Sequence, residues 1–200
     1  MKIICIGRNY KEHILELKNN IPNDIIFFLK PETAIPLKNQ PFFIPDFSNE
    51  IHHEIEVVIK IKKTGKHIKE KFACNYYNEI SLGIDFTARD IQKKIKSNGE
   101  PWEKSKAFDG SAPVGKFIRV EDVQKIKFKL LVNGEVRQLG NTQNMIHSVD
   151  CLISYISQFI TLKKGDLVFT GTPSGVAKVK KGDLLEGMIE NEKILEVKVR

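Results

Sequence analysis

The chain has 200 residues, 41% of them hydrophobic, which is enough to build one compact domain around a buried core. The net charge is +7, but 27 of the 32 basic residues are lysines, scattered in runs of no more than two. Proteins that read nucleic acids favour Arg, because its planar fork binds phosphate and guanine through two hydrogen bonds. We therefore expect a solvated, lysine-rich surface and no nucleic-acid partner. The runs of apolar residues are also shorter than the roughly 18 that a membrane span needs, so no membrane partner is expected.

Cysteine usage indicates a reducing compartment. Cys5, Cys74 and Cys151 are odd in number, far apart and without a Cys-x-x-Cys pair. They suit a cytoplasmic protein with buried thiols better than a disulfide framework or a zinc site.

Strands are predicted to outnumber helices. The strands are expected at 2–6, 25–29, 54–62, 80–86 and 128–140, the last forming a hairpin, and the helices at 10–20, 88–96 and 145–160. Asn19, Asn20 and Pro22 are expected to end the first helix, Thr87 to cap the second, and Gly99 and Pro101 to end it. Four prolines between residues 31 and 50 predict an extended connection with an edge strand.

Turn signals support a β-rich fold. Asn133-Gly134 is a strong hairpin signal, and the Lys-Lys-Gly-Asp segments at 163–166 and 180–183 each precede a strand. Strands and helices do not alternate regularly, as a doubly wound sheet would require. We predict a single β-rich α+β domain over residues 1–200, whose first 50 residues form an N-terminal segment.

Paired carboxylates are the clearest chemical feature. Glu54 and Glu56 are two residues apart on a predicted strand and would share one face, and Asp85 lies at the end of another strand. A solvent-facing strand edge would explain the pair without any function, but Ile55 and Val57 beside it are typical of a core. Three carboxylates suit a hard cation such as Mg²⁺. Zinc is less suited, because no His-x-x-x-His pair is present.

Two further segments could take part in a site. His13 and Glu16 would share one face of a helix, where a carboxylate can orient an imidazole that acts as a general base, although an incidental exposed pair is an open alternative. Residues 169–175, rich in Gly and hydroxyl side chains, could cradle a carboxylate through backbone N–H groups or form a plain turn.

Several segments together resemble the fumarylacetoacetate hydrolase family. They occur in the family's order and cover residues 7 to 176, and they comprise Gly7-Arg8-Asn9-Tyr10 with His13 and Glu16, His52-His53-Glu54-Ile55-Glu56, Asp85-Phe86-Thr87-Ala88-Arg89-Asp90 with Gln92, Pro101-Trp102 through Lys106-Ala107-Phe108-Asp109, Val132-Asn133-Gly134-Glu135, and Gly171-Thr172-Pro173-Ser174-Gly175-Val176. The closest match is the small acylpyruvase branch, whose members also decarboxylate oxaloacetate.

The resemblance implies a mixed β-sandwich roll with a few short helices, a homodimer, and Mg²⁺ or Mn²⁺ as cofactor. By position, it implies Glu54, Glu56 and Asp85 as metal ligands. It implies Arg8, Gln92, Lys106 and Thr172 as substrate-binding residues, and His13 and Glu16 as the catalytic pair, with Lys106 as the active-site lysine. Residues 10–20 would form a lid. The other basic residues are expected at the surface.

The implied reaction is metal-dependent hydrolysis of acylpyruvates, which are 2,4-dioxo acids, to pyruvate and a carboxylic acid through a metal-stabilised enolate. Decarboxylation of oxaloacetate would use the same enolate. Isomerisation or decarboxylation of 2-hydroxy-dienedioates is the alternative within the family, and a non-catalytic, basic nucleic-acid-binding protein is the alternative outside it.

Overall fold

The computed structural model describes residues 1–18, 20–37 and 40–200. Its helices are α1 (Lys11–Glu16), α2 (Arg89–Asn98), α3 (Glu103–Lys106) and α4 (Val149–Phe159). Its strands are β1 (Ile3–Gly7), β2 (Ile26–Lys30), β3 (Ile51–His53), β4 (Ile55–Ile61), β5 (Tyr77–Ile84), β6 (Thr87–Ala88), β7 (Ile118–Arg119), β8 (Lys127–Val132), β9 (Glu135–Asn141), β10 (Leu167–Phe169), β11 (Ala177–Lys178), β12 (Leu184–Ile189) and β13 (Glu192–Lys198).

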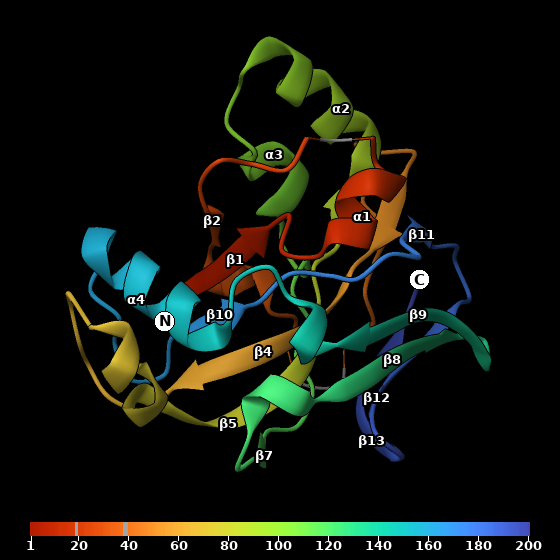
Figure 1. Cartoon of the computed structure of the whole chain (residues 1–200). Coiled ribbons are helices and arrows are strands. Elements are labelled where there is room, and N and C mark those ends of the chain that lie inside the picture. The colour runs from red at the N-terminus through yellow and green to blue at the C-terminus, as the bar shows by residue number, and fades with distance from the viewer. Residues whose placement is uncertain (19, 38–39) are drawn as a thin grey trace.

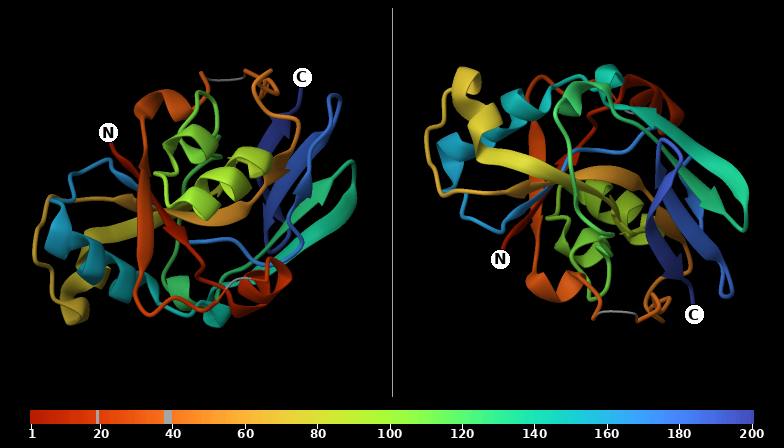
Figure 2. Two further views of the ribbon diagram at one scale, coloured as in Figure 1. Left: turned by 90° about the horizontal axis from the view of Figure 1, so that it is seen from above. Right: turned by 90° about the horizontal axis from the view of Figure 1, so that it is seen from below.

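Three sheets form in the described part of the chain. The largest has the order β2-β1-β10-β4-β5-β7 and is mixed, because β1 and β10 run parallel while its other neighbours are antiparallel. A four-stranded antiparallel sheet, β13-β12-β8-β9, and a small sheet, β11-β3-β6, complete the roll. Helices α1, α2 and α3 gather toward one end of the molecule, at the top of Figure 1, and the four-stranded sheet lies along one side (Figure 2). The predicted β-rich α+β class is confirmed.

Both faces of the large sheet are buried. Ile4 and Ile6 of β1 join the main core, whereas Ile3 and Cys5 join a second apolar cluster, as the two-residue period of a strand requires. Apolar residues of the four-stranded sheet, such as Leu130 and Leu185, belong to the main core. In the described part of the chain, no helix combines the length and the apolar character needed to cross a bilayer.

Local turn predictions are confirmed. The hairpin of β8 and β9 turns at Asn133 and Gly134, which both have positive φ angles, 54° and 82°. The two Lys-Lys-Gly-Asp turns also share one geometry, since the Asp166 carboxylate accepts a hydrogen bond from Lys163 N and the Asp183 carboxylate accepts one from Lys180 N, both 2.7 Å long.

Several local predictions were wrong in detail. Thr87 does not cap α2, because its hydroxyl contacts Lys106 and the helix begins after Ala88. The helix predicted from residue 145 begins at Val149, since the backbone N–H groups of residues 146 and 147 bind Asn9 instead. The predicted extended connection contains a short 3₁₀ turn, Glu32–Ala34. The short α3 was not predicted. Cys74 is exposed, not buried.

Two predictions involve residues outside the described ones. The first helix ends at Glu16, four residues before its predicted end, and Asn19 lies outside the described part of the chain. Residues 38 and 39 of the predicted extended connection also lie outside it.

Candidate active site

The three predicted carboxylates lie together in the interior. Glu54 lies between β3 and β4, where the chain passes from the small sheet to the large one, and Glu56 is the second residue of β4. Pairing of β4 with β5 places Asp85 beside them, and Asp85 N donates a 2.8 Å hydrogen bond to Glu54 O. One oxygen from each carboxylate lies within 4.8 Å of the others. All three are at most 5% exposed, so the alternative of a solvent-facing strand edge is excluded.

Buried cations surround these carboxylates. Lys106 of α3 places its ammonium 2.8 Å from Glu54 Oε2, 2.7 Å from Asp85 Oδ2 and 2.6 Å from Thr87 Oγ1. Arg89 of α2 forms an ion pair with Glu54, and Lys30 Nζ lies 2.7 Å from Asp85 Oδ1. The expectation that basic residues other than Arg8 and Lys106 lie at the surface was therefore wrong for Lys30 and Arg89, which are buried because they neutralise these acids.

Burial and charge shift the pKa values of this cluster in opposite directions. Burial alone would raise the pKa of Glu54, but the Lys106 ammonium and the Arg89 guanidinium outweigh it and hold that pKa well below its usual value. Burial, and then the negative charges of Asp85 and Glu54, raise the pKa of Glu56 well above its usual value. Burial would lower the pKa of Lys106, but Asp85 and Glu54 raise it. The negative charge at Glu56 is thus the least compensated.

His13 and Glu16 form a pair on α1. His13 Nδ1 lies 3.2 Å from Glu16 Oε2, and His13 is buried while the Glu16 side chain is 31% exposed. Burial would raise the pKa of Glu16, but the hydrogen bonds from His13 and from Gly175 N outweigh it and lower that pKa. An incidental exposed pair is excluded, because His13 lines the same pocket as the three carboxylates.

The Gly-rich segment that follows β10 does cradle carboxylates, but they belong to the protein itself. Gly171 N donates a 2.7 Å hydrogen bond to Glu56 Oε2, and Gly175 N donates a 2.9 Å hydrogen bond to Glu16 Oε1. Gly171 has a φ of +100°, and a Cβ there would lie 2.7 Å from Asn9 Cβ, so a side chain would not fit. The Gly-rich loop thus binds Glu56 of the predicted metal ligands and Glu16 of the predicted catalytic pair.

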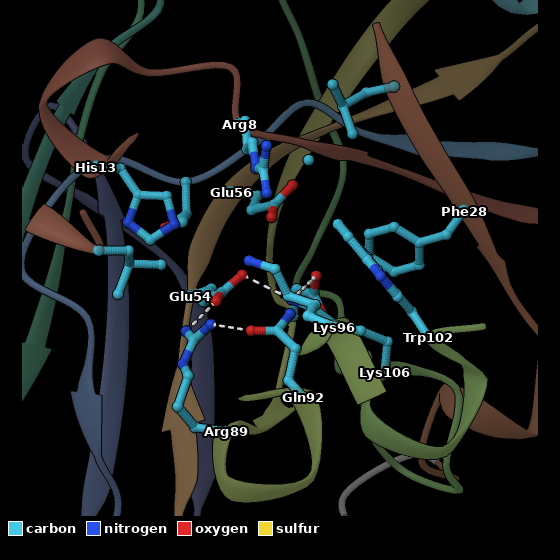
Figure 3. Close-up of a pocket in the computed structure, with 15 residues that line it drawn as sticks. Arg8, His13, Phe28, Glu54, Glu56, Arg89, Gln92, Lys96, Trp102 and Lys106 are labelled. Carbon is cyan, nitrogen blue, oxygen red and sulfur yellow. Dashed lines mark hydrogen bonds and ion pairs between the residues drawn. The ribbon is translucent and has the colours of Figure 1, made fainter. Parts of the chain in front are cut away.

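The predicted substrate-binding residues line this pocket as well. Figure 3 shows His13 on one side, Phe28 and Trp102 on the other, and Glu54 and Glu56 between them. Arg8, Gln92, Lys106 and Thr172 also line it. Arg8 has a φ of 63°, a left-handed conformation that is uncommon for a non-glycine residue, at the point where the chain leaves β1 toward α1.

Gln138 of β9 is a structural member of the site that the sequence did not indicate. Its Oε1 accepts hydrogen bonds from His53 Nδ1 (2.9 Å) and Ile55 N (3.1 Å), and its Nε2 donates to Thr172 Oγ1 (2.8 Å) and Pro173 O (2.9 Å). It therefore links the two neighbours of Glu54 to the Gly-rich loop, from a different sheet. Arg89 belongs to the segment 85–90 that resembles the family, but no role was predicted for it. Its spacing of three residues from Gln92 could have indicated that both side chains face the site. The sequence around Lys30 and Gln138 carries no comparable signal.

The carboxylates fit a divalent cation. Three buried oxygen donors converge, and burial together with their mutual repulsion raises the pKa of Glu56. A divalent cation among them would relieve that repulsion. Asp85 Oδ1 adds to this fit, because it is buried and accepts no hydrogen bond of good geometry, although it is ion-paired with Lys30.

The fold and this acid-and-imidazole pocket define an enzyme family. The model of the fumarylacetoacetate (FAA) hydrolase C-terminal family matches residues 2–200, and the chain belongs to this family of enzymes. It is 39% identical over 201 residues to the mitochondrial oxaloacetate tautomerase FAHD1 of Mus musculus, covering 99% of this chain and 91% of that protein. It is 43% identical over 188 residues to the oxaloacetate tautomerase YcgM of Escherichia coli (strain K12), covering 92% and 86%. The crystal structure of fumarylpyruvate hydrolase from Pseudomonas aeruginosa in complex with Mn²⁺ and pyruvate superposes with a TM-score of 0.93 at 36% identity, covering 100% of this chain and 89% of that one.

Proposed function

We propose that this chain is a divalent-cation-dependent enzyme of 2-oxo and 2,4-dioxo acids, which hydrolyses acylpyruvates to pyruvate and a carboxylic acid. The observation that carries the proposal is the His13–Glu16 pair in the same pocket as the three buried carboxylates. The similarity to a fumarylpyruvate hydrolase that binds Mn²⁺ and pyruvate supports both the substrate class and the cation.

The carboxylates and cations have separate tasks in this proposal. Glu54, Glu56 and Asp85 would hold Mg²⁺ or Mn²⁺, which supplies Lewis-acid stabilisation of the negative charge that develops on the 2-keto oxygen. Arg8 and Gln92 would bind the 2-oxo carboxylate end, and Thr172 would help to position it. Lys106, already hydrogen-bonded to Glu54 and Asp85, keeps these ligands oriented and offsets their charge.

His13 carries out the proton transfers in this proposal. Oriented by Glu16, the imidazole takes a proton from a water molecule, whose oxygen adds to the distal carbonyl of the acylpyruvate. The bond between that carbonyl carbon and C3 of the pyruvate unit then breaks, and its electron pair goes to C3. His13 returns the proton to C3, which leaves pyruvate and a carboxylic acid. The low pKa of Glu16 keeps its carboxylate charged beside the imidazolium that forms.

Oxaloacetate is the second candidate substrate, and the relatives named oxaloacetate tautomerase favour it. The same His13–Glu16 pair can move a proton between C3 and the 2-keto oxygen, which is a keto–enol interconversion and needs no water. Loss of CO₂ from oxaloacetate also needs no water as nucleophile. One pocket can therefore serve hydrolysis, tautomerisation and decarboxylation.

A turnover screen tests the proposal. The full chain with Mg²⁺ or Mn²⁺ is assayed on acetylpyruvate, fumarylpyruvate, oxaloacetate and a 2-hydroxy-dienedioate, each with and without chelator. We expect chelator-sensitive cleavage of the acylpyruvates. His13→Ala is expected to impair that cleavage more than oxaloacetate decarboxylation, because only the former needs an activated water. Full turnover in the presence of chelator would refute the dependence on a divalent cation. Turnover of the 2-hydroxy-dienedioate alone would refute the proposed hydrolysis of acylpyruvates.

A further inference from the structure

Helix α2 presents three polar side chains to the pocket from a single face. Arg89, Gln92 and Lys96 are spaced three and four residues apart, so they lie along one side of the helix, and all three line the pocket. Arg89 is ion-paired with Glu54 and hydrogen-bonded to Gln92. Lys96 has no role in the proposed chemistry, yet Figure 3 shows its side chain extending toward the centre of the pocket.

Lys96 enters this pocket from α2. It also lines a neighbouring pocket with Leu17, Gln92 and Lys93, which the three carboxylates do not line. Its ammonium lies 5.9 Å from the centre of the Trp102 ring, and Figure 3 shows it between that ring and His13. A 2-oxo acid whose keto and carboxylate oxygens face Glu54, Glu56 and Asp85, and whose next carbonyl lies beside His13, would bring a carboxylate at its far end within reach of Lys96.

The charge of the lining favours a substrate with two negative charges. Among the described residues that line the pocket, four are cationic, Arg8, Arg89, Lys96 and Lys106, whereas three are carboxylates. A bound divalent cation would add two positive charges to this excess, and a monoanionic substrate would neutralise only part of it. Burial, and then the charges of Arg8, Arg89 and Lys106, lower the pKa of Lys96, so an anion next to it would relieve repulsion among the cations.

We propose that Lys96 binds the second carboxylate of a dicarboxylic 2-oxo acid and thereby makes the enzyme selective for dicarboxylates over 2-oxo acids with an apolar tail. The inference rests on the proposed function and names the substrate class within it. A charge-assisted hydrogen bond at a half-buried site supplies the discrimination, which is lost when the tail ends in a methyl group.

Two unreactive 2-oxo acids test this selectivity by binding alone. 2-Oxoglutarate and 2-oxovalerate share the 2-oxo carboxylate end and differ only in a terminal carboxylate or methyl group. Their dissociation constants are measured by calorimetry with the Mn²⁺-loaded full chain and its variants. Lys96→Gln is expected to weaken 2-oxoglutarate binding about tenfold and 2-oxovalerate binding less than twofold. Lys96→Arg should retain most of the preference.

Lys94→Gln is the matched control, because it removes the same charge from an exposed position of the same helix. It should leave both dissociation constants within twofold of the wild type. Equal losses for the two acids in Lys96→Gln, or no loss for either, overturn the inference while the proposed function stands. If the wild type binds neither acid and turns over no substrate of the screen, the proposed function fails and the inference with it.

Discussion

The backbone N–H of Gly175 donates a 2.9 Å hydrogen bond to Oε1 of Glu16, across 159 residues of sequence. The other carboxylate oxygen of Glu16 contacts His13, so one side chain both orients the imidazole and ties α1 to the Gly-rich loop. The same loop binds Glu56 through Gly171 N. Helix α1, which belongs to the segment expected to act as a lid, is therefore tied to the Gly-rich loop by a group that also takes part in the proposed chemistry.

Replacing Glu16 should release α1 from the Gly-rich loop and also remove the group that orients the His13 imidazole. Glu16→Ala is expected to reduce turnover of acylpyruvates by about 100-fold, at the low end of the effect of a general acid–base group. Limited proteolysis should also cut more readily within residues 10–20 in the Mn²⁺-loaded protein with oxalate. Glu12→Ala, which changes an exposed residue of the same helix, is the control. Wild-type turnover in Glu16→Ala would contradict the assigned role.

Replacing Glu56, the least compensated carboxylate, should weaken cation binding without destabilising the cation-free protein. Glu56→Gln keeps an oxygen for the Gly171 N–H but removes the repulsion with Asp85 and Glu54. We expect Mn²⁺ affinity to fall at least about tenfold by calorimetry, because an anionic ligand is lost. In chelator, the Tm of the variant should not fall below that of the wild type. The control is Glu79→Gln, which changes a partly exposed carboxylate of β5. Unchanged Mn²⁺ affinity in Glu56→Gln would remove this residue from the ligand set.

Gln138 should matter for both stability and the cation site. Gln138→Leu leaves the buried N–H groups of Ile55 and His53 without an acceptor, at a cost of about 2–4 kcal/mol in the free energy of unfolding. Because Glu54 lies between these two residues, Mn²⁺ affinity should also fall. Gln138→Glu retains the acceptor and should recover part of the affinity, which a general loss of packing would not allow. Gln143→Leu, at an exposed position, should change neither quantity.

Lowering the pH should remove the contribution of the Asp166 carboxylate to the free energy of unfolding. Burial would raise the pKa of this carboxyl, but hydrogen bonds and an ion pair with Lys2 and a hydrogen bond from Lys163 N outweigh it and lower the pKa. A lowered pKa in the folded state stabilises the protein above the ordinary pKa of about 4, and this contribution is lost as the pH falls through the folded value. Asp166→Asn should therefore cost about 1–2 kcal/mol at pH 7.

The difference between wild type and Asp166→Asn, measured by denaturant unfolding, should shrink below about pH 4. Asp183→Asn is the control, because Asp183 occupies the same position in the second Lys-Lys-Gly-Asp turn but is only half-buried, whereas Asp166 is buried. A difference that stays constant down to pH 3 would show that the Asp166 charge is not the source of the effect.

Much of the site could be anticipated from local sequence. A strand's two-residue period places Glu54 and Glu56 on one face, and a helix's spacing places His13 beside Glu16; both relationships hold in the structure. The ordered motifs indicated the family, and the Asn-Gly and Gly-Asp signals indicated turns, because the residues that can adopt those backbone angles are few.

What the sequence by itself determined is therefore the set of groups whose partners lie within a few residues, together with the family and the β-rich class. The tertiary structure alone decided which cations neutralise the carboxylates and what holds the site together. Lys30 meets Asp85 across 55 residues, Arg89 meets Glu54 across 35, and Gln138 meets Ile55 across 83. A lone Lys or Gln has no periodic pattern around it. Its burial follows from the packing of sheets on one another, and its charge or amide is then satisfied by whichever groups that packing brings within reach.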